Sequence, residues 1–522
     1  MRKTILKISL TAAVVAMFAT AGCQSANPTP SVVTATPTPS EAYTPVASVT
    51  VTPSPTPFVS ETVGRYEAEA AKLNGKVKVV TVKGSQQISG EAYVKGFEDE
   101  GDSCTFSINV PSDGFYNMTF KQQGIGGEKT NFVSVDGEYL GSITVDDKML
   151  RETRLDRIYL SAGKHEVSVY KSWGWIYLDY LEISTAEPVN PGMYEVSGKL
   201  SNPNASENTK RLYNYICDIY GTYFLSGQVC DEGPNGGEMY VVRSATGKNP
   251  AILSMDLNAY GASRPAGQEK GKTVEYAKEW WEKGGIVEFH WHWTLEEKYC
   301  TKEWWRSFYT DSTNFNLTKA LNGSDSYGYE MLLRDIDAIG EALKPLAESD
   351  IPVIFRPLHE ASGKWFWWGN YGSDSYKKLY YLMYERLTEK WGLNNLIWLW
   401  NAQDPDWYVG DEYCDIVGTD IYPGERVYTS QSAAFFDLKE VSPEGKPVWL
   451  SENGCIFDPD LALRDGAMWG CWCVWQGEFV RQKSFLRLSE QYTEKSMLIK
   501  AYNHDNVITL DMLPDLKAYT AE

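Results

Sequence analysis

The sequence predicts a multidomain protein in which an N-terminal β-sandwich, jelly-roll-like, is followed by a (β/α)₈ TIM barrel. Two observations predict this fold class. Residues 63–186 carry short stretches of period-2 alternation separated by turn residues, and residues 205–522 alternate short apolar runs with amphipathic helical stretches. The length of 522 residues also fits two folded units with connecting segments better than it fits one.

The β-rich region is predicted from its strand and turn signals. Phe106, Ile108 and Val110 alternate with polar residues, which is the pattern of a half-buried strand. Further strand-like stretches lie near 116–120, 132–135 and 167–170, and Ser-Asp-Gly and Val-Asp-Gly turn signals separate them. Several short strands at this spacing are typical of a β-sandwich.

The barrel is predicted from eight short apolar runs with helical patterns between many of them. The candidate strands are 223–226, 251–255, 285–289, 352–355, 396–400, 415–419, 447–450 and 468–475. Helical patterns cover 274–283, 329–349 and 376–391. In a (β/α)₈ barrel the catalytic residues lie where the strands end at the carboxyl face, so charged residues at those ends are the candidates.

Two glutamates follow separate candidate strands. Glu360 follows the strand 353–355, and Glu452 follows the strand 448–450. Glycoside hydrolysis needs one carboxyl group to protonate the leaving oxygen and a second to attack or to activate water. Each glutamate alone could be a salt-bridged residue at a strand end. Two of them in tryptophan-rich surroundings, with three of the five histidines also at strand ends, favour the catalytic interpretation.

Composition narrows the class of ligand. A net charge of −20 argues against nucleic acid, which requires a basic surface. The chain has 19 Trp and 33 Tyr, and flat aromatic faces are what sugar rings stack on. A tryptophan-rich core explains only some of them.

The N-terminus has the composition of an export signal. Residues 1–23 comprise a basic start, an apolar stretch and small residues before Cys23, and they resemble a lipoprotein signal, although Thr20 stands where Leu is usual. Residues 24–60 form a Pro/Ser/Thr-rich linker. We expect an exported protein anchored by lipid at Cys23 to the outer face of a bacterial membrane, or otherwise secreted, with no other membrane contact.

The remaining eight cysteines match no zinc-binding spacing. Cys471 and Cys473 lie in an apolar run and are predicted to be buried thiols.

The strand-end motifs resemble those of glycoside hydrolase family 26. The resemblance rests on Arg356-Pro-Leu-His-Glu360, the following Trp-Phe-Trp-Trp at 365–368, and the motifs at 285–293, 418–422, 450–454 and 508–514. It implies a retaining endo-β-1,4-mannanase that acts on plant-type β-mannan, glucomannan and their oligosaccharides, without a cofactor for catalysis and as a monomer. The alternatives are a xylanase or mixed-linkage glucanase on the same scaffold, or a non-catalytic surface glycan-binding lipoprotein.

The resemblance also implies residue roles. Glu360 is similar to the general acid/base and Glu452 to the nucleophile. The implied substrate-binding residues of the barrel are His292, His359, Trp365, Asp420, Tyr422 and Trp475. Gln476 stands where some mannanases have Arg, which puts that contact with a distal sugar in doubt. His290 is left outside the site, and Trp367 and Trp368 are at least as well explained by packing.

The β-rich region resembles carbohydrate-binding module family 35, through Tyr-Glu-Ala-Glu-Ala at 66–70 and the motif at 175–183. The resemblance implies a structural Ca²⁺ held by Glu67, Glu69 and Asp179, since hard oxygen ligands suit that ion. Trp173 and Trp175 are the candidates for a sugar-stacking platform, with burial in the core as the alternative.

Overall fold

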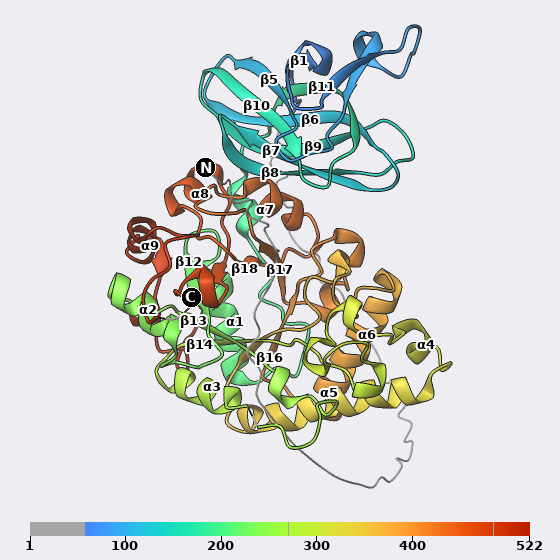
Figure 1. The fold of residues 1–522 in the computed structure, drawn as a ribbon. Coiled ribbons are helices and arrows are strands. Elements are labelled where there is room, and N and C mark those ends of the chain that lie inside the picture. The colour runs from blue at the N-terminus through green and yellow to red at the C-terminus, as the bar shows by residue number, and fades with distance from the viewer. Residues whose placement is uncertain (1–57, 270, 484, 522) are drawn as a thin grey trace, which may run out of the picture.

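The computed structural model describes residues 58–269, 271–483 and 485–521. It has two lobes, an all-β lobe and a larger α/β lobe that packs against it (Figure 1). The predicted signal segment with Cys23 and nearly all of the linker lie outside the described residues. Within the described part of the chain, no helix combines the length and apolar character needed to cross a bilayer.

The all-β lobe is a sandwich of two antiparallel sheets, as predicted. One sheet contains β1 (Thr62–Glu67), β3 (Lys78–Thr81), β4 (Ala92–Lys95), β6 (Gly114–Gly124), β9 (Arg151–Leu160) and β11 (Ile176–Thr185). The other contains β2 (Lys72–Asn74), β5 (Ser103–Val110), β7 (Lys129–Val135), β8 (Glu138–Val145) and β10 (Gly163–Lys171). Alternation in β5 buries Phe106, Ile108 and Val110 between the sheets. The first and last strands, β1 and β11, pair directly.

The second lobe is a closed barrel of eight parallel strands. They are β12 (Phe224–Val229), β13 (Ile252–Asp256), β14 (Ile286–His290), β15 (Val353–Arg356), β16 (Leu396–Trp400), β17 (Ile416–Ile421), β18 (Val448–Asn453) and β19 (Cys471–Val474). Each pairs with the next, and β12 closes the barrel by pairing with both β19 and β13. A short strand, β20 (Val507–Ile508), adds to β12. All eight predicted strands overlap observed ones.

Helices surround the barrel. They are α1 (Glu207–Ile219), α2 (Gly237–Thr246), α3 (Thr273–Glu282), α4 (Leu317–Leu321), α5 (Ser326–Ala347), α6 (Ser373–Glu385), α7 (Ser432–Lys439), α8 (Pro459–Asp465) and α9 (Lys495–Tyr502). The three predicted helices correspond to α3, α5 and α6. Helix α5 shows why they form: Leu332, Ile336 and Leu343 make one buried stripe, and Asp325 caps the first turn by accepting from the Gly328 amide.

The barrel core is rich in tryptophan. Ten of the nineteen tryptophans are fully buried: Trp280, Trp291, Trp293, Trp367, Trp368, Trp398, Trp400, Trp449, Trp469 and Trp472. The core therefore explains about half of the tryptophan content. The eight described cysteines are free, and Cys471 and Cys473 are buried thiols as predicted.

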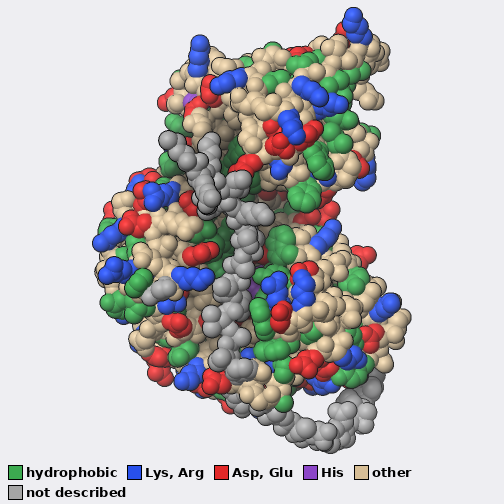
Figure 2. Space-filling model, in the orientation of Figure 1, with side chains coloured by type: hydrophobic (Ala, Val, Ile, Leu, Met, Phe, Trp, Pro, Cys, Tyr) green, Lys and Arg blue, Asp and Glu red, His purple; other side chains and the backbone are tan. Residues whose placement is uncertain are grey.

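The two lobes share a packed interface, formed mainly by α7 against β9. Ala433 of α7 is part of the apolar cluster of the sandwich. The Arg157 guanidinium of β9 lies 5.0 Å from the Phe436 ring centre, and the Arg464 guanidinium of α8 lies 4.5 Å from that of Tyr159. On the face shown in Figure 2, acidic and basic side chains are interspersed over both lobes.

Candidate active site

Three carboxylates meet at the carboxyl ends of neighbouring barrel strands. Glu360 follows β15, Asp420 lies near the end of β17, and Glu452 lies near the end of β18. One carboxylate oxygen from each lies within 4.8 Å of the other two. The sequence had placed Glu360 and Glu452 on separate strands, and the barrel brings them together.

Arg356, the last residue of β15, pairs with two of these carboxylates and with Glu288 of β14. Its guanidinium is fully buried and donates to Glu288 at 3.2 Å, to Asp420 at 2.7 Å and to Glu452 at 2.6 Å. Three carboxylates around one cation leave an excess of negative charge. Burial and the neighbouring Glu452 accordingly raise the pKa of Asp420 to about 7, against the opposing attraction of Arg356.

Glu452 is held at both oxygens. One oxygen accepts from Arg356, and the other accepts from the Tyr422 hydroxyl. Tyr422 in turn packs edge-on against Phe479, with ring centres 5.2 Å apart. The Glu452 carboxylate is therefore fixed in orientation by a cation and a phenol, as a nucleophile requires.

Glu360 has the opposite environment. Its backbone adopts a left-handed conformation with φ +54°, held by a 2.7 Å hydrogen bond from its amide to the Asn401 carbonyl. Its carboxyl accepts from the Trp365 indole at 2.8 Å. Burial, together with the charges of Asp420 and Glu452, raises the pKa of Glu360 well above its usual value. The raised pKa favours the protonated form of Glu360, the form that can act as an acid.

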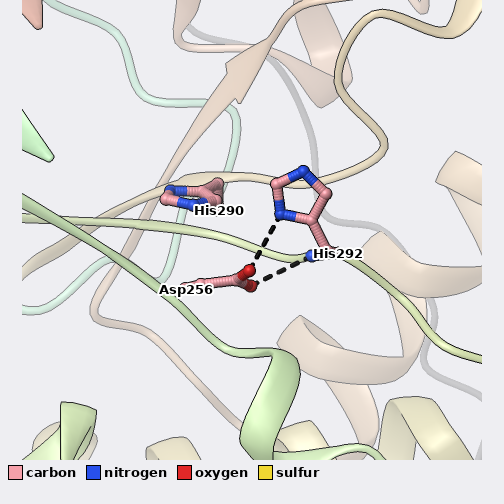
Figure 3. Close-up of side chains that lie close together, drawn as sticks. All are labelled: Asp256, His290 and His292. Atoms are coloured by element: carbon pink, nitrogen blue, oxygen red, sulfur yellow. Dashed lines mark hydrogen bonds and ion pairs between the residues drawn. The ribbon is translucent and has the colours of Figure 1, made fainter. Parts of the chain in front are cut away.

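The histidines form a second group at the same rim of the barrel, at the ends of the paired strands β14 and β15. His292 donates from Nδ1 to Asp256 at 2.8 Å, and its backbone amide donates to the same carboxylate at 3.0 Å (Figure 3). Its ring centre lies 4.7 Å from that of His359 and 5.9 Å from that of Trp475. His290, left outside the predicted site, lies beside them, 5.4 Å from Trp475 between ring centres.

The other predicted residues differ in their access to a ligand. Trp365 is 45% exposed, whereas His359 is only 1% exposed and offers little surface to a sugar. Trp367 and Trp368 are buried and donate to the carbonyls of Trp293 and His359, so their role is packing.

Sequence reasoning missed the residues that orient the site. Arg356 belongs to a motif but has no role predicted from the sequence, and no role is predicted for Glu288, Asp256 or Asn401. Glu288 and Arg356 did leave a signal, since a charged residue inside an apolar strand must be paired if it is buried. Asn401 binds Asp420 through its side chain, and only the fold reveals that contact.

The sandwich carries two further candidate sites. Trp173 and Trp175, in the connection between β10 and β11, are 70% and 53% exposed, so core burial is excluded for both. The pairing of β1 with β11 brings Glu67 and Glu69 near Asp179, as their mutual electrostatic interactions show. Within the described residues, the two groups of potential metal ligands whose atoms all lie within 4.8 Å of one another are both in the barrel, and the predicted calcium ligands do not form such a group.

The fold and the paired carboxylates define the class of protein, a glycoside hydrolase with an appended β-sandwich. The sequence profile of glycosyl hydrolase family 26 matches residues 201–511, and that of carbohydrate-binding module family 35 matches residues 64–186. The chain belongs to glycosyl hydrolase family 26.

Similar proteins share both lobes. A mannan endo-1,4-β-mannosidase of Thermothelomyces thermophilus is 35% identical over 89% of this chain and 93% of its own length. Mannan endo-1,4-β-mannosidase A of Piromyces sp. is 34% identical over 86% of this chain and 72% of its own. The crystal structure of a Podospora anserina family 26 β-(1,4)-mannanase with a family 35 module matches with a TM-score of 0.59 and 32% identity, covering 87% of this chain and 99% of that one.

Proposed function

We propose that the protein is a retaining endo-β-1,4-mannanase that hydrolyses mannan or glucomannan. The observation that carries the proposal is the pair formed by Glu360 and Glu452. One oxygen of each lies within 4.8 Å of the other, which fits the separation of about 5–5.5 Å between carboxyl groups in retaining enzymes and not the roughly 6.5–9.5 Å of inverting enzymes. The mannan specificity is taken from the relatives named above.

The environments of the two groups assign their roles. Glu452 attacks the anomeric carbon while Glu360 gives its proton to the departing oxygen. Formation of the glycosyl-enzyme removes the charge of Glu452, so the pKa of Glu360 falls. Glu360 can then take a proton from the water that resolves the intermediate.

Replacement of the nucleophile tests the assignment. Glu452→Gln should lower kcat by several orders of magnitude on mannan, with the melting temperature retained. Activity within tenfold of wild type would show that Glu452 is not the nucleophile. A substrate panel of mannan, glucomannan, xylan and lichenan decides specificity, and preference for xylan or lichenan would redirect the proposal to those polymers.

We further propose that the remaining barrel residues, His292, His359, Asp420, Tyr422 and Trp475, line the subsite at the cleavage point. Trp365 is suited to stack on the sugar beyond the cleavage point, because its ring is exposed and its indole nitrogen is hydrogen-bonded to Glu360. The low exposure of His359 limits it to an edge contact.

The sandwich is proposed to hold the enzyme on polymer through Trp173 and Trp175. Their exposure supports this role, since two neighbouring indole rings open to solvent can stack on sugar rings. Trp173→Ala combined with Trp175→Ala should reduce retention on insoluble mannan without changing turnover of short oligosaccharides. Unchanged retention would make the sandwich a spacer.

A structural Ca²⁺ in the sandwich fits the residues present. One oxygen of Glu67 and one of Glu69 are buried without a hydrogen-bond partner, and the Asp179 carboxylate is fully buried. Lys121, 3.5 Å from Asp179, offsets only part of this charge. Glu67, Glu69 and Asp179 would hold the ion, which would supply structural rather than catalytic chemistry.

We propose export with lipid attachment at Cys23, on the sequence of the N-terminal segment alone. Labelled fatty acid should be incorporated into wild type and not into Cys23→Ala. Equal labelling would rule out attachment at that cysteine.

A further inference from the structure

A hydrogen-bonded chain links the ends of four neighbouring barrel strands, β19, β12, β13 and β14, and ends beside the strand that carries the acid/base. Gln476 follows β19 and donates from its amide to Asp231, after β12, at 2.6 Å. Asp231 accepts from the backbone amide of Asp256, at the end of β13, at 2.8 Å. Asp256 then accepts from His292, after β14. The chain ends at a ring that lies beside His359, the residue before Glu360.

The Asp256 carboxylate accepts hydrogen bonds from two backbone amides in addition to the His292 ring. One oxygen accepts from the backbone amides of Asn258 at 2.8 Å and of His292 at 3.0 Å. The other accepts from His292 Nδ1 at 2.8 Å. Figure 3 shows both contacts to His292, with the far ring nitrogen pointing away from Asp256. The side chain is thus fixed by two amides, and the ring is fixed by the side chain.

These contacts determine the tautomer of His292. An ionised carboxylate can only accept, so Nδ1 must carry a proton. In the neutral ring Nε2 is then an acceptor. Within the described residues, Nε2 makes no hydrogen bond, and it is not one of the polar atoms that are buried without a partner. Nε2 is therefore open to solvent and contributes to the 8% of His292 that is exposed.

We propose that Asp256 is a positioning residue, which fixes the orientation and tautomer of His292 so that Nε2 faces a hydroxyl group of the bound sugar. This inference rests on the proposed function, because it requires a sugar at His292. It assigns a role to a carboxylate that does not touch the substrate.

The electrostatics of the site are consistent with this role. Burial alone would lower the pKa of His292, but the Asp256 carboxylate raises it above its usual value. Burial opposes ionisation of Asp256, yet the neighbouring histidines lower its pKa to about 2. The Asp256 carboxyl group is therefore ionised at the pH values at which the enzyme would be assayed. The charged or titratable groups facing this pair are Asp231, Arg264, His290, Arg356, His359 and Glu452.

Asp256→Asn is a sharp test, because the structure determines how the amide must orient. The oxygen that receives two backbone amides must remain the carbonyl oxygen, so the new NH₂ group faces His292 Nδ1. Nδ1 then has to accept, and the proton moves to Nε2. The substitution keeps the shape of the side chain at position 256. It changes His292 Nε2, the atom that faces the sugar, from a hydrogen-bond acceptor into a donor.

The experiment uses the full chain with ¹⁵N-labelled histidine. Only five histidines are present, so long-range ¹H–¹⁵N spectra can report each tautomer, with His292→Ala assigning the signal. We expect Asp256→Asn to convert His292 to the Nε2–H form, to lower its titration midpoint and to reduce kcat/KM on mannan by about tenfold or more. In a protein that already carries His292→Ala, adding Asp256→Asn should reduce kcat/KM on mannan little further.

Asp335→Asn is the matched control. Asp335 is also a buried carboxylate, and it accepts from the indole of Trp293, the residue next to His292, at 2.8 Å. Asp335→Asn should lower the melting temperature of the protein without changing the tautomer of His292. An unchanged tautomer in Asp256→Asn, or losses from Asp256→Asn and His292→Ala that simply add, would overturn the inference. A wild type inactive on mannan would instead refute the proposed function, while the tautomer result would still stand.

Discussion

The catalytic carboxylates differ because each has different neighbours. Glu452 accepts from a guanidinium and a phenol, whereas among the described residues Glu360 accepts from an indole alone and faces two carboxylates. The same functional group therefore serves as nucleophile in one place and as acid in the other.

Removal of the acid should depend on the leaving group. Glu360→Ala should lose at least about a thousandfold on mannan, because the departing sugar alkoxide needs a proton. It should retain most activity on an aryl β-mannoside whose phenol leaves readily without one. Steady-state rates on both substrates check this, and an equal loss on the two would show that Glu360 is not the acid.

The raised pKa of Glu360 should also appear as a dependence of stability on pH. A carboxyl group with a raised folded-state pKa contributes stability that is complete below its unfolded pKa of about 4.3 and is lost as pH rises through the folded value. Glu360→Gln cannot ionise, so its melting temperature should exceed that of wild type by a margin that grows from about pH 4 to pH 8, to a few degrees. Calorimetry across that range measures the margin.

The exposed Glu341 of α5 provides the control for this measurement. Glu341→Gln removes a carboxylate that faces solvent, so its melting temperature relative to wild type gives the reference profile across the same pH range. If Glu360→Gln behaved in the same way, the crowding of carboxylates would carry no cost in stability.

At the scale of elements, the pairing of β1 with β11 brings acidic residues from the two ends of the sandwich together. Ser89 relieves part of this crowding, since its hydroxyl donates to Glu67 at 2.6 Å and its amide donates to Asp179 at 3.1 Å. One oxygen each of Glu67 and Glu69 remains buried without a partner.

Chelation should therefore destabilise this lobe. Calcium that binds the folded sandwich stabilises it by mass action, so a chelator should lower the melting temperature of the sandwich by several degrees while the rate on short oligosaccharides hardly changes. Thermal scans of the full chain with and without chelator measure the effect, and Glu69→Gln should reduce it. Coincident scans would argue against the ion.

At the scale of the whole molecule, the lobes are joined by more than a linker. Helix α7 contributes Ala433 to the sandwich core, and Phe436 packs under Arg157. The sandwich therefore covers an apolar face of the barrel that would otherwise meet water.

Deletion of residues 63–186 should separate stability from chemistry. The catalytic carboxylates lie at strand ends of the barrel, so turnover of short oligosaccharides should stay within a few-fold of wild type. The melting temperature of the barrel should fall by several degrees because α7 becomes exposed, and Phe436→Ser in the deleted protein should reduce its aggregation. An unchanged melting temperature would mean that the interface contributes little.

The sequence by itself determined the architecture and the reacting groups. Period-2 alternation located strands of the sandwich, and short apolar runs with helical patterns between them located the barrel strands, with the strand-end motifs guiding the last two. Glu360 and Glu452 could be found because a barrel places strand ends at one face, whatever the details of packing.

Only the tertiary structure decided how those groups are held. The contacts of Arg356 with Glu288, and of Asp256 with His292, join residues 68 and 36 positions apart. No local pattern encodes such pairings, because they depend on which strands become neighbours and how far each side chain reaches. The exposure of Trp173 and the burial of Trp368 were equally open in the sequence, since an aromatic side chain suits both a core and a sugar.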